Sequence, residues 1–215
     1  MSGFHTFPTE RADVLEDPSR YRFCSREELL SMLGLVGVRG PDGDMDSDAV
    51  VADLGSGTGF FTDDVAPFTA TCYAVDLQAE MHAYYREKGL PENVECVTSG
   101  IDSLPFPDDH LDAAYSTMTH HEYADPTVRD VDGDRGLDEF EDAALTELAR
   151  VIRPDGRLAI VDWSGDGEGD AGPDRAERFS LANVTDGLES TGFEIEMAVN
   201  RPDTLAVVAR NGPHG

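Results

Sequence analysis

Five short apolar runs, rich in β-branched and aromatic residues, recur along the chain and are separated by longer polar segments. They cover Val50–Leu54, Thr71–Asp76, Val94–Val97, Leu111–Ser116 and Leu158–Trp163. Continuous apolar runs of this kind are typical of strands buried on both faces of a parallel sheet. The segments between them carry helical periodicity. This alternation of strand and helix predicts an α/β fold with helices on both faces of the sheet.

Helix start and stop signals fall between these runs. Residues Ser25 to Glu28 form a capping box ahead of four apolar residues, so a helix is expected to run to about Gly34. Further helices are expected just after Gly59, over 78–88, from Phe140 to Ile152 and from Leu181 to Ser190. The last two strands, 193–199 and 204–209, are joined by four residues. They therefore form a hairpin, in which one strand runs antiparallel to the sheet.

The first strand ends in a glycine turn in which Gly55, Gly57 and Gly59 stand at alternate positions. Glycine has no Cβ, so the backbone can turn sharply and approach a ligand at the N-terminus of the following helix. The dinucleotide fingerprint places its third glycine at position 60, which is Phe60 here, and this disfavours NAD or FAD. The next strand ends in Asp76, where a βαβ unit delivers a carboxylate to ribose hydroxyls.

Four stretches resemble the class I S-adenosylmethionine-dependent methyltransferases of type 11, and they occur in the family's order. They are VADLGSGTG, AVDLQAEM, LPFPDDHLDAAYS and ELARVIRPDGRLAIVDW. The resemblance spans roughly residues 20 to 210. It implies a seven-stranded doubly wound, Rossmann-like methyltransferase sheet with a C-terminal antiparallel hairpin, and S-adenosylmethionine as cofactor. It also implies an N-terminal lid, residues 1–24, ahead of a methyltransferase domain, residues 25–211.

The resemblance implies a set of cofactor-binding residues at the carboxyl ends of the first four strands. The set is Asp53, Gly55, Ser56, Gly57, Asp76, Leu77, Ile101, Asp102 and Ser116. The glycines would approach the methionine moiety through their backbone and Asp53 would orient the turn, while Asp76 would bind both ribose hydroxyls. At the adenine, either Asp102 reaches the exocyclic amine or backbone groups around Ile101 recognise the ring alone.

Two adjacent histidines, His120 and His121, follow the fourth strand, at the sheet edge where open α/β sheets bind ligands. Either is a candidate for the general base that takes a proton from a methyl acceptor. Both are also candidates for packing or capping residues at a helix start. No metal site is expected, because neighbouring helix positions do not face one another and no cysteine or histidine spacing suits zinc.

The charge balance changes the expected partners. The 215 residues include 44 acidic and 16 basic ones, for a net charge of −28, and Lys88 is the only lysine. Nucleic acid and anionic membrane surfaces are therefore unlikely partners, since both require a basic face. The composition resembles that of haloarchaeal proteins, which work in molar salt where the Debye length is about 3 Å. The chain shows no secretory leader and no run of 18 apolar residues, so a cytoplasmic location is expected.

The sequence thus predicts an enzyme that moves a methyl group from S-adenosylmethionine to a small-molecule acceptor. The alternatives are a non-catalytic S-adenosylmethionine-binding or partner-regulating protein and, third, a nicotinamide-linked oxidoreductase. Residues 125–138 are expected to form a charged insertion on the substrate side. The acceptor atom and the oligomeric state stay open at this point.

Overall fold

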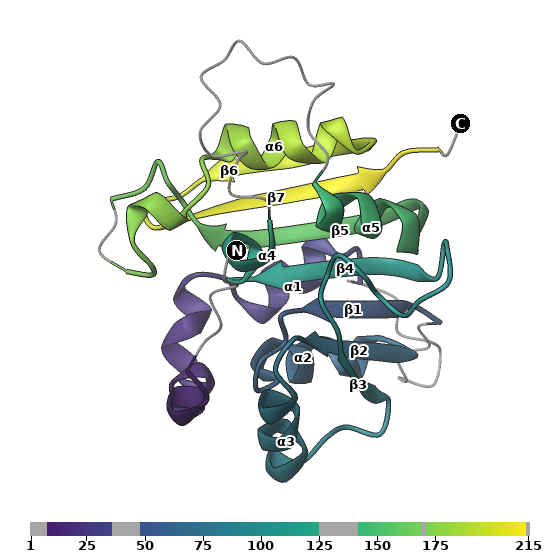
Figure 1. Ribbon diagram of the computed structural model, residues 1–215, viewed down its shortest axis with the longest axis vertical. Coiled ribbons are helices and arrows are strands. Elements are labelled where there is room, and N and C mark those ends of the chain that lie inside the picture. The colour runs from purple at the N-terminus through teal and green to yellow at the C-terminus, as the bar shows by residue number, and fades with distance from the viewer. Residues whose placement is uncertain (1–7, 36–47, 125–141, 169–170, 214–215) are drawn as a thin grey trace.

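A seven-stranded sheet forms the centre of the molecule in the computed structural model, which describes residues 8–35, 48–124, 142–168 and 171–213 (Figure 1). The strand order is β3-β2-β1-β4-β5-β7-β6. The strands are β1 (Val50–Leu54), β2 (Thr71–Asp76), β3 (Val94–Thr98), β4 (Leu111–Thr117), β5 (Ile152–Trp163), β6 (Phe193–Asn200) and β7 (Thr204–Asn211). Strands β1 to β5 are parallel, and β7 is antiparallel to both β5 and β6. This confirms the predicted methyltransferase-type sheet with its C-terminal hairpin.

Helices cover both faces of the sheet (Figure 1). They are α1 (Arg26–Met32), α2 (Phe60–Val65), α3 (Ala79–Lys88), α4 (His120–Tyr123), α5 (Ala143–Val151) and α6 (Leu181–Ser190). Short 3-10 helices complete the list: η1 (Thr9–Glu16), η2 (Pro18–Arg22), η3 (Ala66–Phe68) and η6 (Arg175–Glu177). None of the described helices has the length and apolar character needed to span a lipid bilayer.

Two apolar clusters, one on each face, hold the helices on the sheet. On one face, Leu148 of α5 and Leu188 of α6 are fully buried, together with Ile160 of β5. On the other face, Leu29 of α1 and Tyr85 of α3 are fully buried. Because successive strand residues point to opposite faces, a continuous apolar strand feeds both clusters at once. The apolar runs of the sequence therefore predict the layer arrangement directly.

The boundary between α5 and β5 differs from the prediction. The helix was expected to reach Ile152 and the strand to begin at residue 158, but α5 ends at Val151 and β5 begins at Ile152. Ile152 has an extended backbone, with φ −82° and ψ 126°, and pairs with Leu111 of β4. Pro154 disfavours helical geometry in the residue before it, so the chain extends and joins the sheet early. The start of this predicted helix and the insertion at 125–138 lie outside the described residues.

Candidate functional site

The glycine turn between β1 and α2 is left-handed at all three glycines. Their φ angles are 76° at Gly55, 53° at Gly57 and 80° at Gly59, a region that side-chain-bearing residues rarely adopt. A Cβ on Gly55 would lie 2.1 Å from Cγ2 of Thr119, and one on Gly59 would lie 2.2 Å from the Tyr85 ring. The turn therefore requires glycine both for its backbone geometry and for the close approach of its neighbours.

Asp76, at the end of β2, is bonded to this turn. Its Oδ2 accepts a hydrogen bond of 2.8 Å from the backbone N–H of Gly57, and its Oδ1 accepts one of 2.8 Å from Gln78. Burial raises the pKa of the Asp76 carboxyl, and these two backbone bonds oppose the shift. A carboxylate has about four lone-pair positions, so each oxygen keeps room for one further bond. Asp76 can thus take two hydroxyl groups, but it also braces the glycine turn.

Asp53 lies one residue before the end of β1 and is almost fully buried. The Thr62 hydroxyl donates a hydrogen bond of 2.6 Å to its Oδ2, and the Tyr115 hydroxyl is a second polar neighbour of the carboxyl, whereas its Oδ1 accepts no hydrogen bond of standard geometry among the described residues. Burial raises the pKa of Asp53 to about 7. A buried acceptor without a partner is costly, so this oxygen favours a ligand that brings a donor or a positive charge.

The other residues of the expected cofactor set differ in exposure. Ser56, Ile101 and Ser116 are buried, whereas Leu77 is 47% exposed and Asp102 is exposed. The N–H of Ser99 donates a 3.1 Å hydrogen bond to the carbonyl of Asp76, which ties the loop after β3 to the end of β2. In this arrangement Leu77 offers an apolar surface next to the Asp76 carboxylate. Ile101 packs into the core, so backbone groups and the exposed Asp102 are what that loop can present.

The two histidines have different surroundings. The backbone N–H of His121 donates a 2.6 Å hydrogen bond to Oδ2 of Asp162, and its Nδ1 lies 2.9 Å from Oδ1 of the same residue. His120 is 2% exposed and packs edge-on against Tyr123, with ring centroids 5.1 Å apart, and against Phe179 at 5.3 Å. His121 is thus oriented by Asp162, whereas His120 is buried against two aromatic rings and its charge also acts on Asp162.

Asp162 was not among the residues expected at the site. It ends the buried part of β5 as Asp76 does in β2, so the same strand-end pattern was present in the sequence. Burial alone would raise the pKa of Asp162, but the neighbouring charge and hydrogen bond of His121 hold it below its usual range. The carboxylate form is thus the one that faces the imidazole.

The connection from β4 to α4 joins these residues to the glycine turn. Met118 has a φ of 61°, which is strained for a residue with a side chain. The hydroxyl of the next residue, Thr119, lies 3.2 Å from the carbonyl oxygen of Thr117 and 3.4 Å from that of Gly55, and it has one proton to donate between them. Glu122 follows, and burial raises its pKa to about 7, with Asp162 and Asp76 adding repulsion that His121 partly offsets. Four acidic groups (Asp53, Asp76, Glu122 and Asp162) and the two imidazoles of α4 therefore gather at the carboxyl ends of β1, β2, β4 and β5.

The N-terminal segment lies against the same turn. A Cβ on Gly57 would be 3.3 Å from Cδ1 of Leu15 in η1. Lys88 of α3 holds this segment through a 3.0 Å ion pair with Glu16, and it also pairs with Asp63 of α2 at 2.9 Å. The described part of the segment thus covers the glycine turn.

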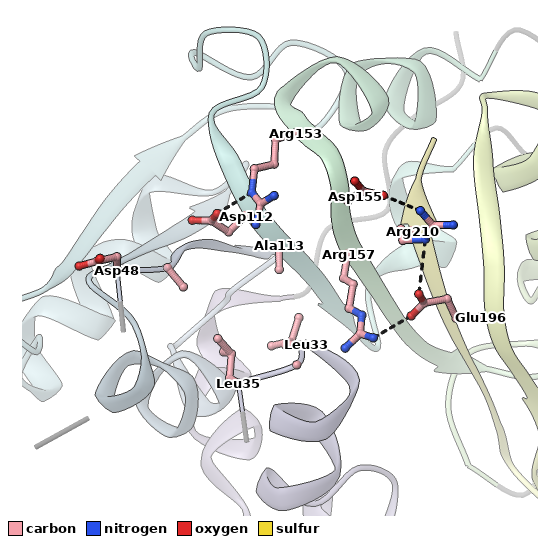
Figure 2. A pocket seen from close by; sticks show the side chains of 12 residues that line it. Leu33, Leu35, Asp48, Asp112, Ala113, Arg153, Asp155, Arg157, Glu196 and Arg210 are labelled. Atoms are coloured by element: carbon pink, nitrogen blue, oxygen red, sulfur yellow. Dashed lines mark hydrogen bonds and ion pairs between the residues drawn. The ribbon is translucent and has the colours of Figure 1, made fainter. Parts of the chain in front are cut away.

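A cavity of about 480 Å³ lies elsewhere, at the amino ends of β1 and β4 (Figure 2). Arg153, Arg157 and Arg210 line it, and each pairs with a carboxylate, as Figure 2 shows. None of the expected site residues contributes to this cavity. The opposite edge of the sheet, with the glycine turn, is therefore the candidate site. Within the part of the chain that the structure describes, no group of three metal-ligating side chains is arranged to hold an ion.

Comparisons with known proteins agree with this geometry. The family model described as a methyltransferase domain matches residues 52–160. The chain is 34% identical over 116 residues to the uncharacterized methyltransferase YcgJ of Bacillus subtilis, a match that covers 52% of this chain and 40% of that protein. It is 33% identical over 114 residues to the demethylmenaquinone methyltransferase of Corynebacterium urealyticum, which covers 53% of this chain and 41% of that protein. The match thus spans less than half the length of these curated relatives.

Among solved structures, the crystal structure of an S-adenosylmethionine-dependent methyltransferase from Aquifex aeolicus is similar over 96% of this chain and 100% of that chain. The TM-score is 0.74 and the sequence identity is 29%.

Proposed function

The chain belongs to the family of S-adenosylmethionine-dependent methyltransferases, and from this premise we propose that it transfers the methyl group of that cofactor to a small-molecule acceptor. The proposal rests on one observation: the glycine turn, Asp76 and the His121–Asp162 pair lie together at one edge of the sheet. A cofactor held at the turn would present its reactive end toward α4.

The residues present fit the cofactor. The unpartnered Oδ1 of Asp53 and the two remaining acceptor positions of Asp76 suit a ligand with an ammonium group and a ribose diol. We assign the backbone of Gly55 and Gly57 to the methionine part, and the exposed Leu77 with the 101–102 loop to the adenine side. When bound, the cofactor supplies a methyl group on a positively charged sulfur, so the protein's main tasks are to align the acceptor and to exclude water.

In this proposal His121 is the general base. If Nδ1 carries its proton toward Asp162, then Nε2 keeps a free lone pair that can take a proton from an acceptor hydroxyl or amine. Asp162 fixes this tautomer and stabilises the imidazolium that forms. His120, which packs on Tyr123 and Phe179, would instead stabilise α4.

The charge of the chain supports a small neutral or cationic acceptor. A net charge of −28 opposes binding to nucleic acid and to anionic membranes. The related demethylmenaquinone methyltransferase is named for a small organic substrate. The acidic composition further supports work in a high-salt cytoplasm. As a separate part of the proposal, residues 1–24 form a lid on the domain formed by residues 25–211.

The test is methyl transfer in molar KCl to a panel of phenols, quinols and amines, with labelled S-adenosylmethionine and with the release of S-adenosylhomocysteine as a second readout. We expect at least one acceptor to be methylated, and the His121→Ala variant to be slower at least tenfold with unchanged affinity for S-adenosylhomocysteine. A protein that binds the cofactor but methylates no member of the panel above the His121→Ala rate would instead be a non-catalytic binder.

A further inference from the structure

Arg20 lies at the glycine turn, although it comes from the N-terminal segment. Its guanidinium carbon is 5.1 Å from the centroid of the Phe60 ring and 5.0 Å from that of Phe61, at the start of α2. One of its nitrogens donates a 2.7 Å hydrogen bond to the carbonyl of Leu15, whose side chain lies over Gly57. Ring stacking and a backbone contact therefore fix this cation beside the turn.

This arginine has no carboxylate partner among the described residues, in a chain with 44 acidic groups. Several other cations are paired: Lys88 binds two carboxylates, and Arg153 and Arg150 each bind at least one. Arg178, which is buried, instead uses its donors on backbone carbonyls. Arg20 is half-buried and uses one of its five N–H donors on Leu15. Burial lowers the pKa of Arg20, and the charges of Asp53 and Glu16 oppose that shift. A half-buried guanidinium with unused donors favours an anion that can be bound by two parallel hydrogen bonds.

Asp53 supplies the complementary observation. It precedes the same turn, lies close enough for its charge to act on Arg20, and has a buried oxygen without a hydrogen-bond partner among the described residues. Opposite charges, each with unused capacity, therefore flank one glycine turn. A turn that only connected a strand to a helix would need neither of them. An α-amino acid carries this pair of charges, a carboxylate and an ammonium group, on one carbon atom.

We infer that Arg20 binds the α-carboxylate of the methionine part of the cofactor, opposite Asp53, which binds its α-ammonium group. The inference rests on the proposed function for the identity of the ligand. It gives the N-terminal segment a direct role in recognition: the cofactor's amino acid end is complete only when η2 lies on the turn. Arg20 is thus a specificity residue for the amino acid part and has no contact with the adenosine part.

The experiment compares two ligands by calorimetry at one fixed KCl concentration. S-Adenosylhomocysteine has the amino acid part, and 5′-methylthioadenosine has the same adenosine thioether without it. For Arg20→Ala we expect a loss of about 10- to 100-fold in affinity for S-adenosylhomocysteine, the range expected for a charge-assisted pair. Affinity for methylthioadenosine should stay within twofold of wild type. Arg20→Lys should fall between them, because an ammonium group cannot form the two parallel bonds.

The matched control is Arg22→Ala. Arg22 belongs to the same 3-10 helix but is exposed and stacks on Phe23, with its guanidinium carbon 4.3 Å from the ring centroid. Its removal changes the net charge equally, and both ligands should keep wild-type affinity. The melting temperature of each variant is measured alongside.

Three results would overturn the inference. Equal losses for both ligands in Arg20→Ala would mean that Arg20 acts through folding of the segment. Unchanged affinity for S-adenosylhomocysteine would place the carboxylate elsewhere. If Arg22→Ala lowered the affinity for S-adenosylhomocysteine as much as Arg20→Ala does, the loss would come from net charge alone. A wild-type protein that binds neither ligand would reject the proposed function itself, which is a separate outcome.

Discussion

Replacing Asp162 with asparagine tests the proposed chemistry most directly. The carboxylate accepts from the backbone N–H of His121 at 2.6 Å and from that of Trp163 at 2.7 Å, and it faces Nδ1 of His121 at 2.9 Å. An amide of the same shape can keep one backbone bond with its oxygen, but its NH₂ group would donate toward Nδ1. The imidazole proton then moves to Nε2, which no longer has a lone pair for the acceptor.

The expected fall in kcat follows from the general-base role proposed for the His121–Asp162 pair. General-base assistance contributes about 10²- to 10⁴-fold to a rate, and the same carboxylate-to-amide change in a serine protease triad lowers kcat about 10⁴-fold through the wrong tautomer. Methyl transfer depends less on proton transfer than acyl transfer does, so we expect a fall in kcat of about 10²-fold. Loss of charge-assisted bonds to Asp162 would also cost about 1.5–3 kcal/mol in the free energy of unfolding.

The assay is kcat as a function of pH, with S-adenosylhomocysteine affinity and melting temperature measured on the same preparations. In wild type, kcat should fall toward acid pH, because a protonated His121 imidazole cannot take a proton from the acceptor, and this fall should vanish in Asp162→Asn. His120→Ala is the control: it should lower the melting temperature and leave kcat within threefold. A kcat in Asp162→Asn within threefold of wild type, or one that follows only the folded fraction, would refute the pairing as a catalytic device.

Three further predictions follow from contacts and charge. Asp76→Asn should weaken S-adenosylhomocysteine binding by about one to three orders of magnitude, and it should also lower the melting temperature, because Asp76 braces Gly57; calorimetry and thermal melts check both. Glu122 has a pKa of about 7 in the folded protein against an ordinary 4.5. The free energy of unfolding of wild type should therefore fall by up to about 3 kcal/mol as pH rises from 4.5 through 7. Urea unfolding of Glu122→Gln should show a flatter dependence of this free energy on pH. The melting temperature should rise steadily from dilute buffer to molar KCl and rise less in a non-ionic osmolyte; a flat KCl curve would contradict the high-salt interpretation.

Much of the fold could be predicted because its elements are specified locally. The boundaries of α6, at Leu181 and Ser190, match the prediction. The side chain of Ser180 caps the first turn of this helix, and Gly192, just after its end, has a φ of 94°. The strand β5 was predicted to begin six residues too late. Its first part pairs with Leu111 through a register shift, which is a tertiary event that periodicity does not record.

The site residues likewise divide into those that local sequence specifies and those that depend on tertiary contacts. Gly55 and Asp76 were predictable because a strand-turn-helix unit needs them at fixed positions. Asp162 carried the same strand-end signal, yet its role depends on His121, which is 41 residues away in the chain and meets it only in the folded sheet. Arg20 gave no sequence signal, because its position over Phe60 depends on how the N-terminal segment packs.

Under the high-salt conditions proposed above, the positions of two cations, Lys88 and Arg20, have a consequence for the glycine turn. Exposed charges interact weakly when the Debye length is about 3 Å, whereas partly buried pairs are screened much less. The side chain of Lys88, the only lysine, is 22% exposed and joins η1 to α2 and α3 through Glu16 and Asp63. Arg20 is half-buried at the turn. Both cations are therefore in surroundings where salt screens their charge only weakly. Together they hold the N-terminal segment against the glycine turn and place positive charge beside that turn. Cofactor recognition at this turn should for that reason depend less on ionic strength than the stability of the acidic surface does.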